Sequence, residues 1–303
     1  MTIALNSVNT NIGAQVALQS LNSTNAQLQT TQKHISTGLR VSDATDDGAA
    51  YAVAQQVRSD VGALTTVNQQ LGNAKGVVGV TVTALGSISD KVVNDAKSLL
   101  AKIGNQNNPQ DARDGYVKQF ASLVGQVADY VDGATINGQT LLGKTGGAAG
   151  TGTSVISSES GSKLSISGAD SSGLASQLAG LIGATFTRGA GGDTFTAAAA
   201  GADQTAAATA LSAAAGAGGY TDVLKKVTTQ AAQAGDDSNR IDATVSFNSS
   251  KIDSLNAGLG ALVDADLSKE AAKLQALQIK QQLGTQALSL ANQAPQSLLS
   301  LFK

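Results

Sequence analysis

One stretch of the chain carries the residue types of a phosphate-binding loop. Residues 138–145 read GQTLLGKT and fit the pattern G-x-x-x-x-G-K-[ST] at every position. In a nucleotide site a strand leads into this loop and a helix follows it, so that backbone N–H groups face the phosphates. Here a helical pattern precedes the loop and the Gly-rich run 146–152 follows it, with no apolar strand ending in Asp to hold magnesium. We therefore expect Lys144 to have no nucleotide role, and we predict no cofactor.

Other groups capable of chemistry are few. Three aspartates in residues 43–47 precede Gly48 and resemble part of a calcium loop, but the alternating ligand spacing and the closing Glu are missing. Helix capping and pairing with Arg40 explain them more simply. The single His34 has no Cys partner and no carboxylate before Asp43, so we interpret it as a partly exposed surface residue. No Ser/His/Asp set or carboxylate pair can be assembled. We predict a protein without catalytic residues, without a metal site and without enzymatic activity.

The composition excludes several classes of partner. Aromatic residues make up 3% of the 303, there is no Trp, and only two prolines occur, which permits long helices. The formal net charge is −2 and no basic run exists, so nucleic acid is not an expected partner. The amide-rich N-terminus does not suit insertion into a membrane, and it lacks the regions of a cleaved secretory signal. We therefore expect any export to use a route without signal cleavage.

Both ends of the chain are long and nearly free of charge. Residues 1–32 contain no Asp, Glu, Lys or Arg, and residues 281–303 contain only the terminal Lys303. A coiled-coil spacing of four and three residues runs through the first end. Its positions are Ala14, Leu18, Leu21, Asn25, Leu28, Gln32, Ile35 and Leu39. The last helix has two rotated apolar stripes, formed by Leu267, Ala271 and Leu274 and by Ile279, Leu283, Ala287, Leu290 and Ala294.

A helix with apolar residues on more than one side and no charge must pack in several directions. Two such helices cannot bury all of each other's apolar surface. We expect the ends to be poorly ordered in the isolated chain and to become helical when other copies supply the missing surface. An ordinary bundle with two mutually buried end helices is the plain alternative. The expected assembly residues are Leu5, Ile12, Leu18, Leu21, Leu28, Ile35, Leu274, Ile279, Leu283, Leu290, Leu298, Leu299, Leu301 and Phe302.

Heptad patterns between the ends predict long helices, and we call their apolar positions the rod seam. One such helix is expected from about Ala49 to Ile103. Between the apolar residues that recur at every seventh position, the remaining seam positions are taken by Val82, Ala96 and Ile103. A third helix starts with Asn108 as N-cap and ends near Gly133. The heptad returns over 224–262 and breaks at 264–266. The rod seam consists of Val57, Leu64, Leu71, Val78, Leu85, Val92, Leu99, Ile252, Leu255, Leu259 and Leu262.

The helical period disappears from about residue 134 to 219. Short alternating pieces at 154–158, 163–167 and 185–187 lie between Gly- and Ser-rich turns, as in hairpins. The predicted fold is mainly α, with long antiparallel coiled-coil rod helices from both chain ends and a small β-rich or irregular insert at the tip. We assign 1–40 and 264–303 to a terminal coiled-coil layer, 41–133 and 220–263 to a rod-like helical bundle, and 134–219 to a surface-exposed insert.

Two distant blocks, in matching order and spacing, carry a family resemblance. The first is NSVNTNIGAQVALQSLNSTNAQL at 6–28 followed by HISTGLRVSDATDDGAAYAVA at 34–54, and the second is DADLSKEAAKLQALQIKQQLGTQALSLANQAPQSLLSLF at 264–302. Both are similar to the terminal blocks of bacterial flagellin, the subunit of the flagellar filament. INGQTLLG at 136–143 also resembles the family's segment after the third rod helix. The middle is only about 85 residues long, so the chain resembles the shorter flagellins, which lack a large outer domain.

The resemblance implies a structural subunit that self-assembles into the helical filament used for swimming, outside the cell on the bacterial flagellum. It implies that the ends form an inner layer and the rod helices an outer tube. It also implies export through the flagellar type III apparatus without a cleaved signal, a cytoplasmic chaperone on the C-terminal end, and junction and cap proteins as partners. Many flagellins carry an Arg-containing segment recognised by an animal Toll-like receptor, and residues 90–102 contain no Arg.

Three alternatives to a filament subunit remain. The nearest is a flagellin-like junction protein between hook and filament, which has similar ends but forms no long polymer alone. The second is a cytoplasmic coiled-coil scaffold, for which charged residues flanking the seam are expected at the ends. The third is a nucleotide hydrolase based on Lys144.

Overall fold

The computed structural model describes residues 11–189, 192–199 and 201–301, with the backbone alone described for 294–301. The chain divides into two compact units. Unit 1 is drawn from residues 1–61 and 253–303, and unit 2 from residues 62–252. The long helices α2 (Gly48–Asp90) and α7 (Tyr220–Val263) each contribute to both units.

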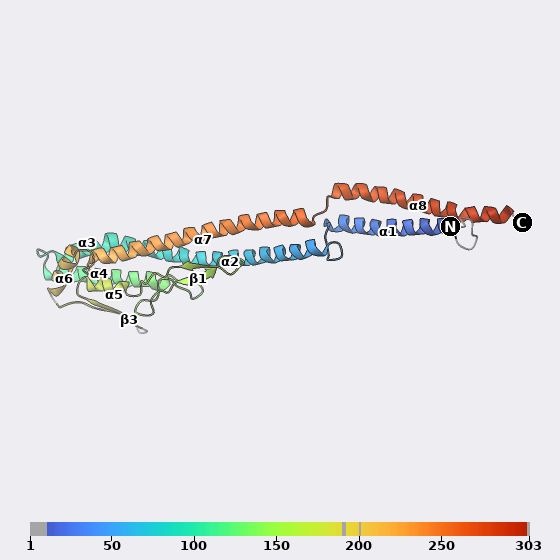
Figure 1. Ribbon diagram of the computed structural model, residues 1–303. Coiled ribbons are helices and arrows are strands. Elements are labelled where there is room, and N and C mark those ends of the chain that lie inside the picture. The colour runs from blue at the N-terminus through green and yellow to red at the C-terminus, as the bar shows by residue number, and fades with distance from the viewer. Residues whose placement is uncertain (1–10, 190–191, 200, 302–303) are drawn as a thin grey trace. The chain divides into compact units, whose positions relative to one another are not determined.

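Unit 1 consists mainly of two antiparallel helices from opposite ends of the chain. Helices α1 (Ile12–Thr37) and α8 (Leu267–Leu301) lie side by side (Figure 1). Asn11 caps α1, because its side-chain oxygen accepts from Ala14 N at 3.0 Å while its Nδ2 donates to Ala291 O at 2.7 Å. At the other end Gly38 adopts a left-handed conformation with φ of 72° and donates to His34 O, which terminates the helix.

A short backbone bridge joins the two helical pairs of unit 1. Leu39 and Asp264 form an isolated antiparallel bridge, Arg40 N donates to Val263 O at 2.7 Å, and Ala265 N donates to Gly38 O at 2.9 Å. The predicted break at 264–266 is confirmed, since α7 ends at Val263 and α8 begins at Leu267. A separate small core seals this junction, which we call the joint. It consists of Val41, Ala50, Ala54 and Val263, with Leu39, Tyr51, Leu259 and Leu262 packed against them.

The first rod helix is continuous but not uniform. Helix α2 passes through a π-helical turn, η1 (Lys91–Ala96), into α3 (Lys97–Gly104), so the predicted helix from about 49 to 103 is confirmed. The π turn was not predicted. It lies beside α7, where the Tyr220 hydroxyl donates to Val93 O at 3.4 Å. The prediction that Val82 lies in the buried seam was wrong. Val82 is exposed, and the neighbouring Thr81 is fully buried instead.

Among the described residues, one helix is long and apolar enough to cross a membrane by length and composition alone. It is Gly48–Gly104. From Leu64 onward its seam positions face protein, and Leu71, Val78 and Leu85 are completely buried in the core of unit 2. The buried core helices of soluble proteins can also pass this test of length and composition.

Helix α4 (Gln110–Gly133) packs against α3 and ends where the sequence predicts. Its start differs from the prediction in one respect. Asn108 does not cap α4, because its Nδ2 donates to Lys102 O at 2.7 Å and so satisfies the last turn of α3. The fully buried Phe120 anchors α4 in the core of unit 2.

The insert combines two hairpins and two short helices. Strands β1 (Thr153–Ile156) and β2 (Lys163–Ile166) pair antiparallel with Thr153 opposite Ile166, and β3 (Thr185–Gly189) pairs with β4 (Gly192–Thr196) with Thr185 opposite Thr196. Helices α5 (Leu174–Gly180) and α6 (Ala202–Ser212) accompany them. The insert is folded onto α4, α3 and α7, and its side chains extend the core of unit 2. Its buried members include Leu142, Ile166, Leu174, Leu178, Ile182 and Phe186.

Candidate assembly surface

The face of α8 that packs on α1 follows a coiled-coil spacing. Several of its members have defined partners on α1. Gln281 Nε2 donates to Asn25 Oδ1 at 2.8 Å, and a Cβ at Gly284 would lie 3.3 Å from Leu21 Cδ1. One apolar residue of the face, Leu277, is buried. The face is formed by Glu270, Leu274, Leu277, Gln281, Gly284, Leu288 and Ala291.

A second face of α8 is apolar and uncovered. Ile279 and Leu283 are each 58% exposed and Leu290 is 70% exposed. At about 100° per residue these three side chains lie within roughly 40° of one another, and roughly 150° from the face that packs on α1. They therefore form a stripe that points away from α1. Leu283 and Leu290 lie in the uncharged run 281–293, and Ile279 lies just before it, next to Lys280.

Helix α1 has an uncovered apolar side as well. Val16 is 60% exposed and Ile12 is also exposed. By the same helical geometry both lie roughly 120° to 160° from the face that contacts α8. We call Ile12 and Val16 of α1, with Ile279, Leu283 and Leu290 of α8, the uncovered stripes.

The structure places the predicted assembly residues in three groups. Leu21, Leu28, Ile35 and Leu274 are half-buried between α1 and α8. Ile12, Leu18, Ile279, Leu283 and Leu290 are exposed. The side chains of Leu5, Leu298, Leu299, Leu301 and Phe302 lie outside the described residues. Sequence reasoning missed Val16, Leu277 and Leu288.

Two details of the predicted end helices were wrong. Leu267 and Ala271 are exposed and do not join Leu274 on the packed face. On α1 the packed face is rotated relative to the predicted seam, so that Leu18 and Gln32 are exposed, while Thr31 is buried.

The predicted position of His34 at the surface was also wrong. Only 8% of His34 is exposed, and its Nδ1 lies 3.5 Å from Glu270 Oε1 at the start of α8. Glu270 Oε2 in turn lies 3.8 Å from Lys273 Nζ. The imidazole is therefore part of the α1–α8 interface, close to the joint.

The aspartates after α1 organise the turn into α2. Lys33 Nζ lies 2.6 Å from Asp43 Oδ2 and 3.0 Å from Asp46 Oδ2, so the partner is Lys33 rather than the expected Arg40, which donates to Leu262 O. The hydrogen bonds from Lys33 lower the pKa of Asp43 from 3.8 to about 2. Lys33 also lowers the pKa of Asp46, with help from the Ser42 backbone. Asp47 caps α2 by accepting from Ala49 N and Ala50 N, as the helix-capping interpretation predicted.

The rod seam lies largely inside protein. Leu64, Leu71, Val78, Leu85, Val92 and Leu99 are buried, whereas Val57, Ile252, Leu255, Leu259 and Leu262 are half-buried. A polar contact missed by sequence reasoning secures the seam in unit 2. Asn248, itself buried, donates from Nδ2 to Asn68 Oδ1 and to Ser157 O, each at 3.1 Å. It thereby ties α7 to α2 and to the first hairpin.

The segment 138–145 is not arranged to bind phosphate. The backbone N–H groups that would have to face an anion are already used within the chain. Lys144 N donates to Ala148 O, Thr145 N to Asp132 Oδ1 at 2.7 Å, and Gly146 N to Ser172 O. The loop follows α4 and leads into turns rather than into a helix. These contacts agree with the interpretation of the motif match as coincidental.

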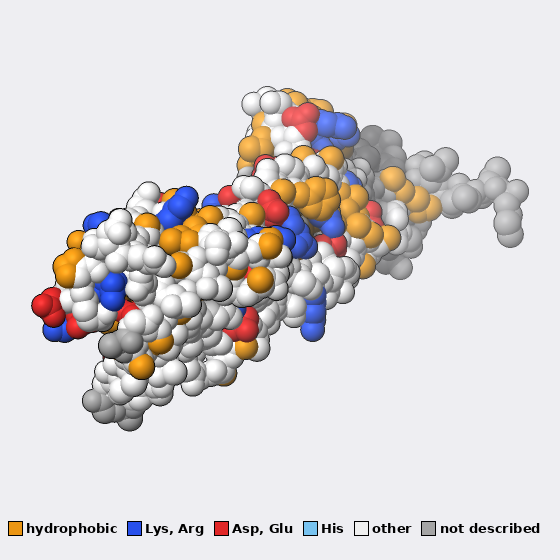
Figure 2. All heavy atoms as spheres, turned by 90° about the vertical axis from the view of Figure 1, so that its left-hand side faces the viewer, with side chains coloured by type: hydrophobic (Ala, Val, Ile, Leu, Met, Phe, Trp, Pro, Cys, Tyr) orange, Lys and Arg blue, Asp and Glu red, His pale blue; other side chains and the backbone are white. Residues whose placement is uncertain are grey.

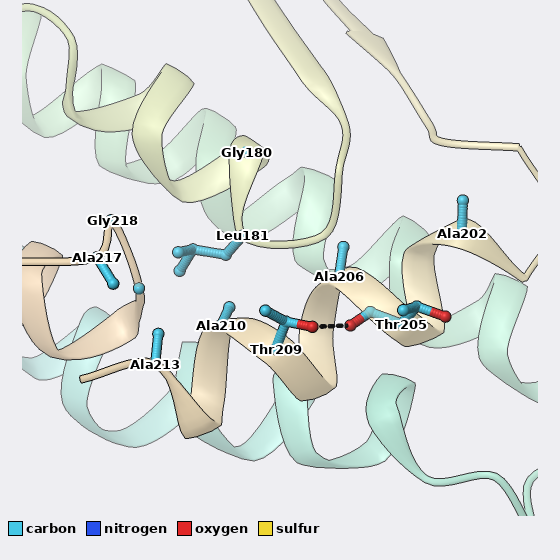
Figure 3. A pocket seen from close by; sticks show the side chains of 11 residues that line it. Gly180, Leu181, Ala202, Thr205, Ala206, Thr209, Ala210, Ala213, Ala217 and Gly218 are labelled. Atoms are coloured by element: carbon cyan, nitrogen blue, oxygen red, sulfur yellow. Dashed lines mark hydrogen bonds between the residues drawn. The ribbon is translucent and has the colours of Figure 1, made fainter.

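A groove of about 610 Å³ lies in the insert, between α6, the end of α5 and the loop before α7 (Figure 3). Gly, Ala, Leu and Thr side chains line it. The Thr209 hydroxyl donates to Thr205 O at 2.8 Å and the Thr205 hydroxyl donates to Gly201 O, so both hydroxyls are used along the helix. The lining offers no titratable side chain for chemistry.

Charges on the insert end of unit 2 are dispersed. On the face that Figure 2 presents, acidic and basic side chains lie singly or in mixed groups among uncharged surface. Arg188 is the centre of one mixed group. Its guanidinium contacts Asp132 at 2.6 Å, Asp129 at 2.8 Å and Asp193 at 2.6 Å, so that acidic and basic charges offset each other there. Over the described ranges, no group of three or more His, Asp or Glu side chains is placed to hold a metal ion.

The fold and its uncovered stripes define a class of protein. It is a mainly helical protein whose two ends pair with each other and still present apolar surface. Comparison with known families specifies it further. Residues 8–146 match the model of the bacterial flagellin N-terminal helical region, and residues 218–302 match that of the bacterial flagellin C-terminal helical region.

Similarity to individual proteins extends over the full length of the chain. Flagellin FljM of Caulobacter vibrioides is 37% identical over 301 residues, which cover 99% of this chain and 100% of the relative. A flagellin of Brucella melitensis is 35% identical over 98% of this chain and 99% of its own length. Flagellin C of Rhizobium meliloti is 32% identical over 99% and 100%. The chain therefore belongs to the bacterial flagellin family, a family of structural proteins rather than enzymes.

Proposed function

We propose that this chain is a subunit of the flagellar filament and that copies associate through the uncovered stripes of α1 and α8. The observation that carries the proposal is the stripe of Ile279, Leu283 and Leu290, which faces directly away from α1. Covering a Leu side chain that is more than half exposed contributes on the order of 1–2 kcal/mol. A polymer repeats this contribution at every subunit.

A second copy of the same chain is the occupant that these surfaces suit best. The chain around Ile12 and Val16 and around Leu283 and Leu290 is rich in amides and carries no charge, with Lys280 beside Ile279 as the nearest charged residue of α8, so like-charge repulsion between identical surfaces is small. A contact between different patches of identical chains generates an open helical polymer when its rotation does not close into a ring. The ends gain helical order as neighbouring copies supply the missing apolar surface.

The family assignment supports a layered arrangement in the polymer. We infer that 1–40 and 264–303 form its inner layer and that 41–133 and 220–263 form the surrounding tube. The insert 134–219 then faces solvent. An uncharged inner layer suits a channel through which unfolded subunits of either charge pass.

The same assignment supports the remaining parts of the proposal. We infer an extracellular location on the bacterial flagellum, used for swimming, and export through the flagellar type III apparatus without a cleaved signal. The expected partners are other copies of the chain, junction and cap proteins, and a cytoplasmic chaperone on the C-terminal end.

Seeded polymerisation followed by electron microscopy tests the proposal. The variant carries Leu283→Gln and Leu290→Gln, which keep helix-forming side chains but remove apolar surface. Loss of about 1–2 kcal/mol at each position should raise the critical concentration by roughly 30-fold or more. Lys280→Gln, on the same helix and exposed, is the matched control and should polymerise like the parent. Equal polymerisation of the double variant and the control would exclude the stripe as the contact.

The same experiment addresses the junction-protein alternative. A filament subunit should extend short filament seeds into long tubes without other proteins. A junction protein should add to the seeds without elongating them. Absence of long tubes from the parent chain over a wide range of concentrations would therefore favour the alternative.

A further inference from the structure

A groove in unit 2 is used neither by the uncovered stripes nor by the rod seam. It consists of two hollows of about 440 and 450 Å³. Helix α2 forms one wall, and strand β1 with the segment before it forms the other. Lys163 lines only the first hollow and Lys144 only the second, so each half of the groove has one lysine. The residues shared by the two hollows are Val77, Gln139, Leu141 and Thr153.

Strand β1 has an edge whose backbone groups are unused. In an antiparallel pair, residues alternate between those that bond to the partner strand and those whose N–H and C=O groups point outward. Ser165, which lies opposite Ser154, points its C=O outward, where it accepts from Arg240 Nη1 at 3.3 Å. Ser154 and, two residues on, Ile156 therefore direct their N–H and C=O groups to the outer edge of β1. In the described part of the chain, these four groups form no backbone hydrogen bond with another element.

The outer edge of β2, by contrast, is covered by α7. Besides the bond from Arg240, Asp237 Oδ2 accepts from Ser167 N at 2.7 Å. An unpaired strand edge is a template for pairing with another chain, and proteins usually protect it with lysine, proline or a bulge on the strand itself. Residues 153–156 read TSVI and pair with β2 in a regular register, so β1 has none of these protections. A further strand can therefore add to the hairpin at β1.

The rest of the groove suits an extended peptide with negative charge. Gln70, Asn73 and Gln139 are exposed, and their amide groups can both donate to and accept from a peptide backbone. Lys144 and Lys163 are also exposed, and over the described ranges neither takes part in an ion pair. No Asp or Glu is among the described residues that line either hollow. The charge of the groove is therefore positive and uncompensated.

We propose that this groove binds an extended acidic peptide segment of a partner protein, which adds to β1 as a third strand. The backbone groups of Ser154 and Ile156 bond to the main chain of the segment, which gives affinity, and the side chains of the groove select its sequence. Four residues of the added strand span about 13 Å. Carboxylates that flank them are attracted by Lys144 and Lys163. The site belongs to unit 2 and goes beyond the proposed function, which uses unit 1.

Fluorescence anisotropy with the unpolymerised chain at low salt tests the role of charge. The probe is a fluorescein-labelled hexapeptide, DTVTVD, and KTVTVK is its basic counterpart. The parent chain should bind the acidic probe at least about tenfold more tightly, because the two lysines attract one peptide and repel the other. Lys144→Gln with Lys163→Gln should weaken binding of DTVTVD by about three- to tenfold. Lys97→Gln with Lys118→Gln changes the net charge equally at exposed positions outside the groove, and should bind like the parent.

N-methylated probes test strand addition separately from charge. One form of DTVTVD is methylated at the backbone nitrogens of both threonines and the other at those of both valines. Alternate N–H groups point to opposite sides of a strand, so one form should lose at least about tenfold in affinity while the other binds like the unmethylated probe.

Three results overturn the proposal. The first is an acidic probe that does not bind the parent chain at millimolar concentration. The second is equal binding by the groove double variant and the control double variant. The third is equal binding of both methylated forms and the unmethylated probe. The proposed function does not depend on any of these outcomes, because no polymer is present in the assay.

Discussion

Single glycines allow close backbone approaches in the insert. A Cβ at Gly150 would lie 2.0 Å from Leu141 O and 2.6 Å from Ala169 O, distances that no side chain tolerates. The backbone of 150–152 must therefore run directly against 141 and 168. Gly115 in α4 differs, since a Cβ there would meet nothing within 4 Å.

These two glycines give a matched pair for thermal unfolding. Gly150→Ala should destabilise unit 2 by about 2 kcal/mol or more, because the backbone must shift to relieve the clash. Gly115→Ala should be neutral or stabilising by up to about 1 kcal/mol, since alanine is the better helix former. Similar unfolding temperatures for the two variants would show that the insert can yield at Gly150.

The aspartates of the α1–α2 turn predict a response to acid. The lowered pKa values mean that these carboxylates stabilise the fold above their ordinary value of 3.8, and that this stabilisation is lost as the pH falls, through about 2 for Asp43. Replacing both with Asn should lower the thermal unfolding temperature at pH 7 and have much less effect at pH 2. An equal effect at both pH values would contradict the role given to Lys33.

Sequence reasoning at the residue scale succeeded where local context was sufficient. The phosphate-loop match could be set aside because the flanking patterns did not fit. His34 could not be placed correctly, because its burial depends on Glu270, which is far away in sequence and approaches only when the chain ends pair. The contacts of Asn248 to Asn68 and Ser157 were hidden for the same reason.

At the scale of elements, heptad spacing predicted most of the long helices. A residue such as Leu71 or Leu85 recurs at every seventh position because one side of the helix must face the core. The π turn at 91–96 was not predictable from this pattern, since α2 and α3 read as one helix through it. On α8 two stripes competed, and only the structure shows that the face containing Leu277 and Gln281 packs on α1.

The pairing of α1 with α8 predicts a specific cross-link. A Cβ at Gly284 would lie 3.9 Å from Leu21 Cβ, within the range of a disulfide. The chain has no cysteine of its own, so Leu21→Cys with Gly284→Cys should form an intramolecular disulfide on oxidation under assembling conditions. It should be detected as a shift in gel mobility without reductant. Leu21→Cys with Ala291→Cys, two helical turns further along α8, is the control and should remain reduced.

On the scale of the whole molecule, the sequence established that the two chain ends belong together. The uncharged blocks at 1–32 and 281–303 and the return of the heptad after the insert predicted a nested order. The extent to which the insert joins the core of unit 2 was not predictable. Leu142, Leu178 and Ile182 sit in short, Gly-rich segments without a clear period, so their burial depends on the helices they meet.

The central claim is that assembly covers the uncovered stripe of α8. Alkylation of a single cysteine placed by Leu283→Cys measures this directly, before and after seeded polymerisation. The account predicts rapid labelling of the monomer and labelling slowed by at least about tenfold in the polymer, as expected for a group protected by packing. Thr187→Cys, on the exposed side of β3, should label equally fast in both states. Polymers in which position 283 is labelled as fast as position 187 would contradict the account.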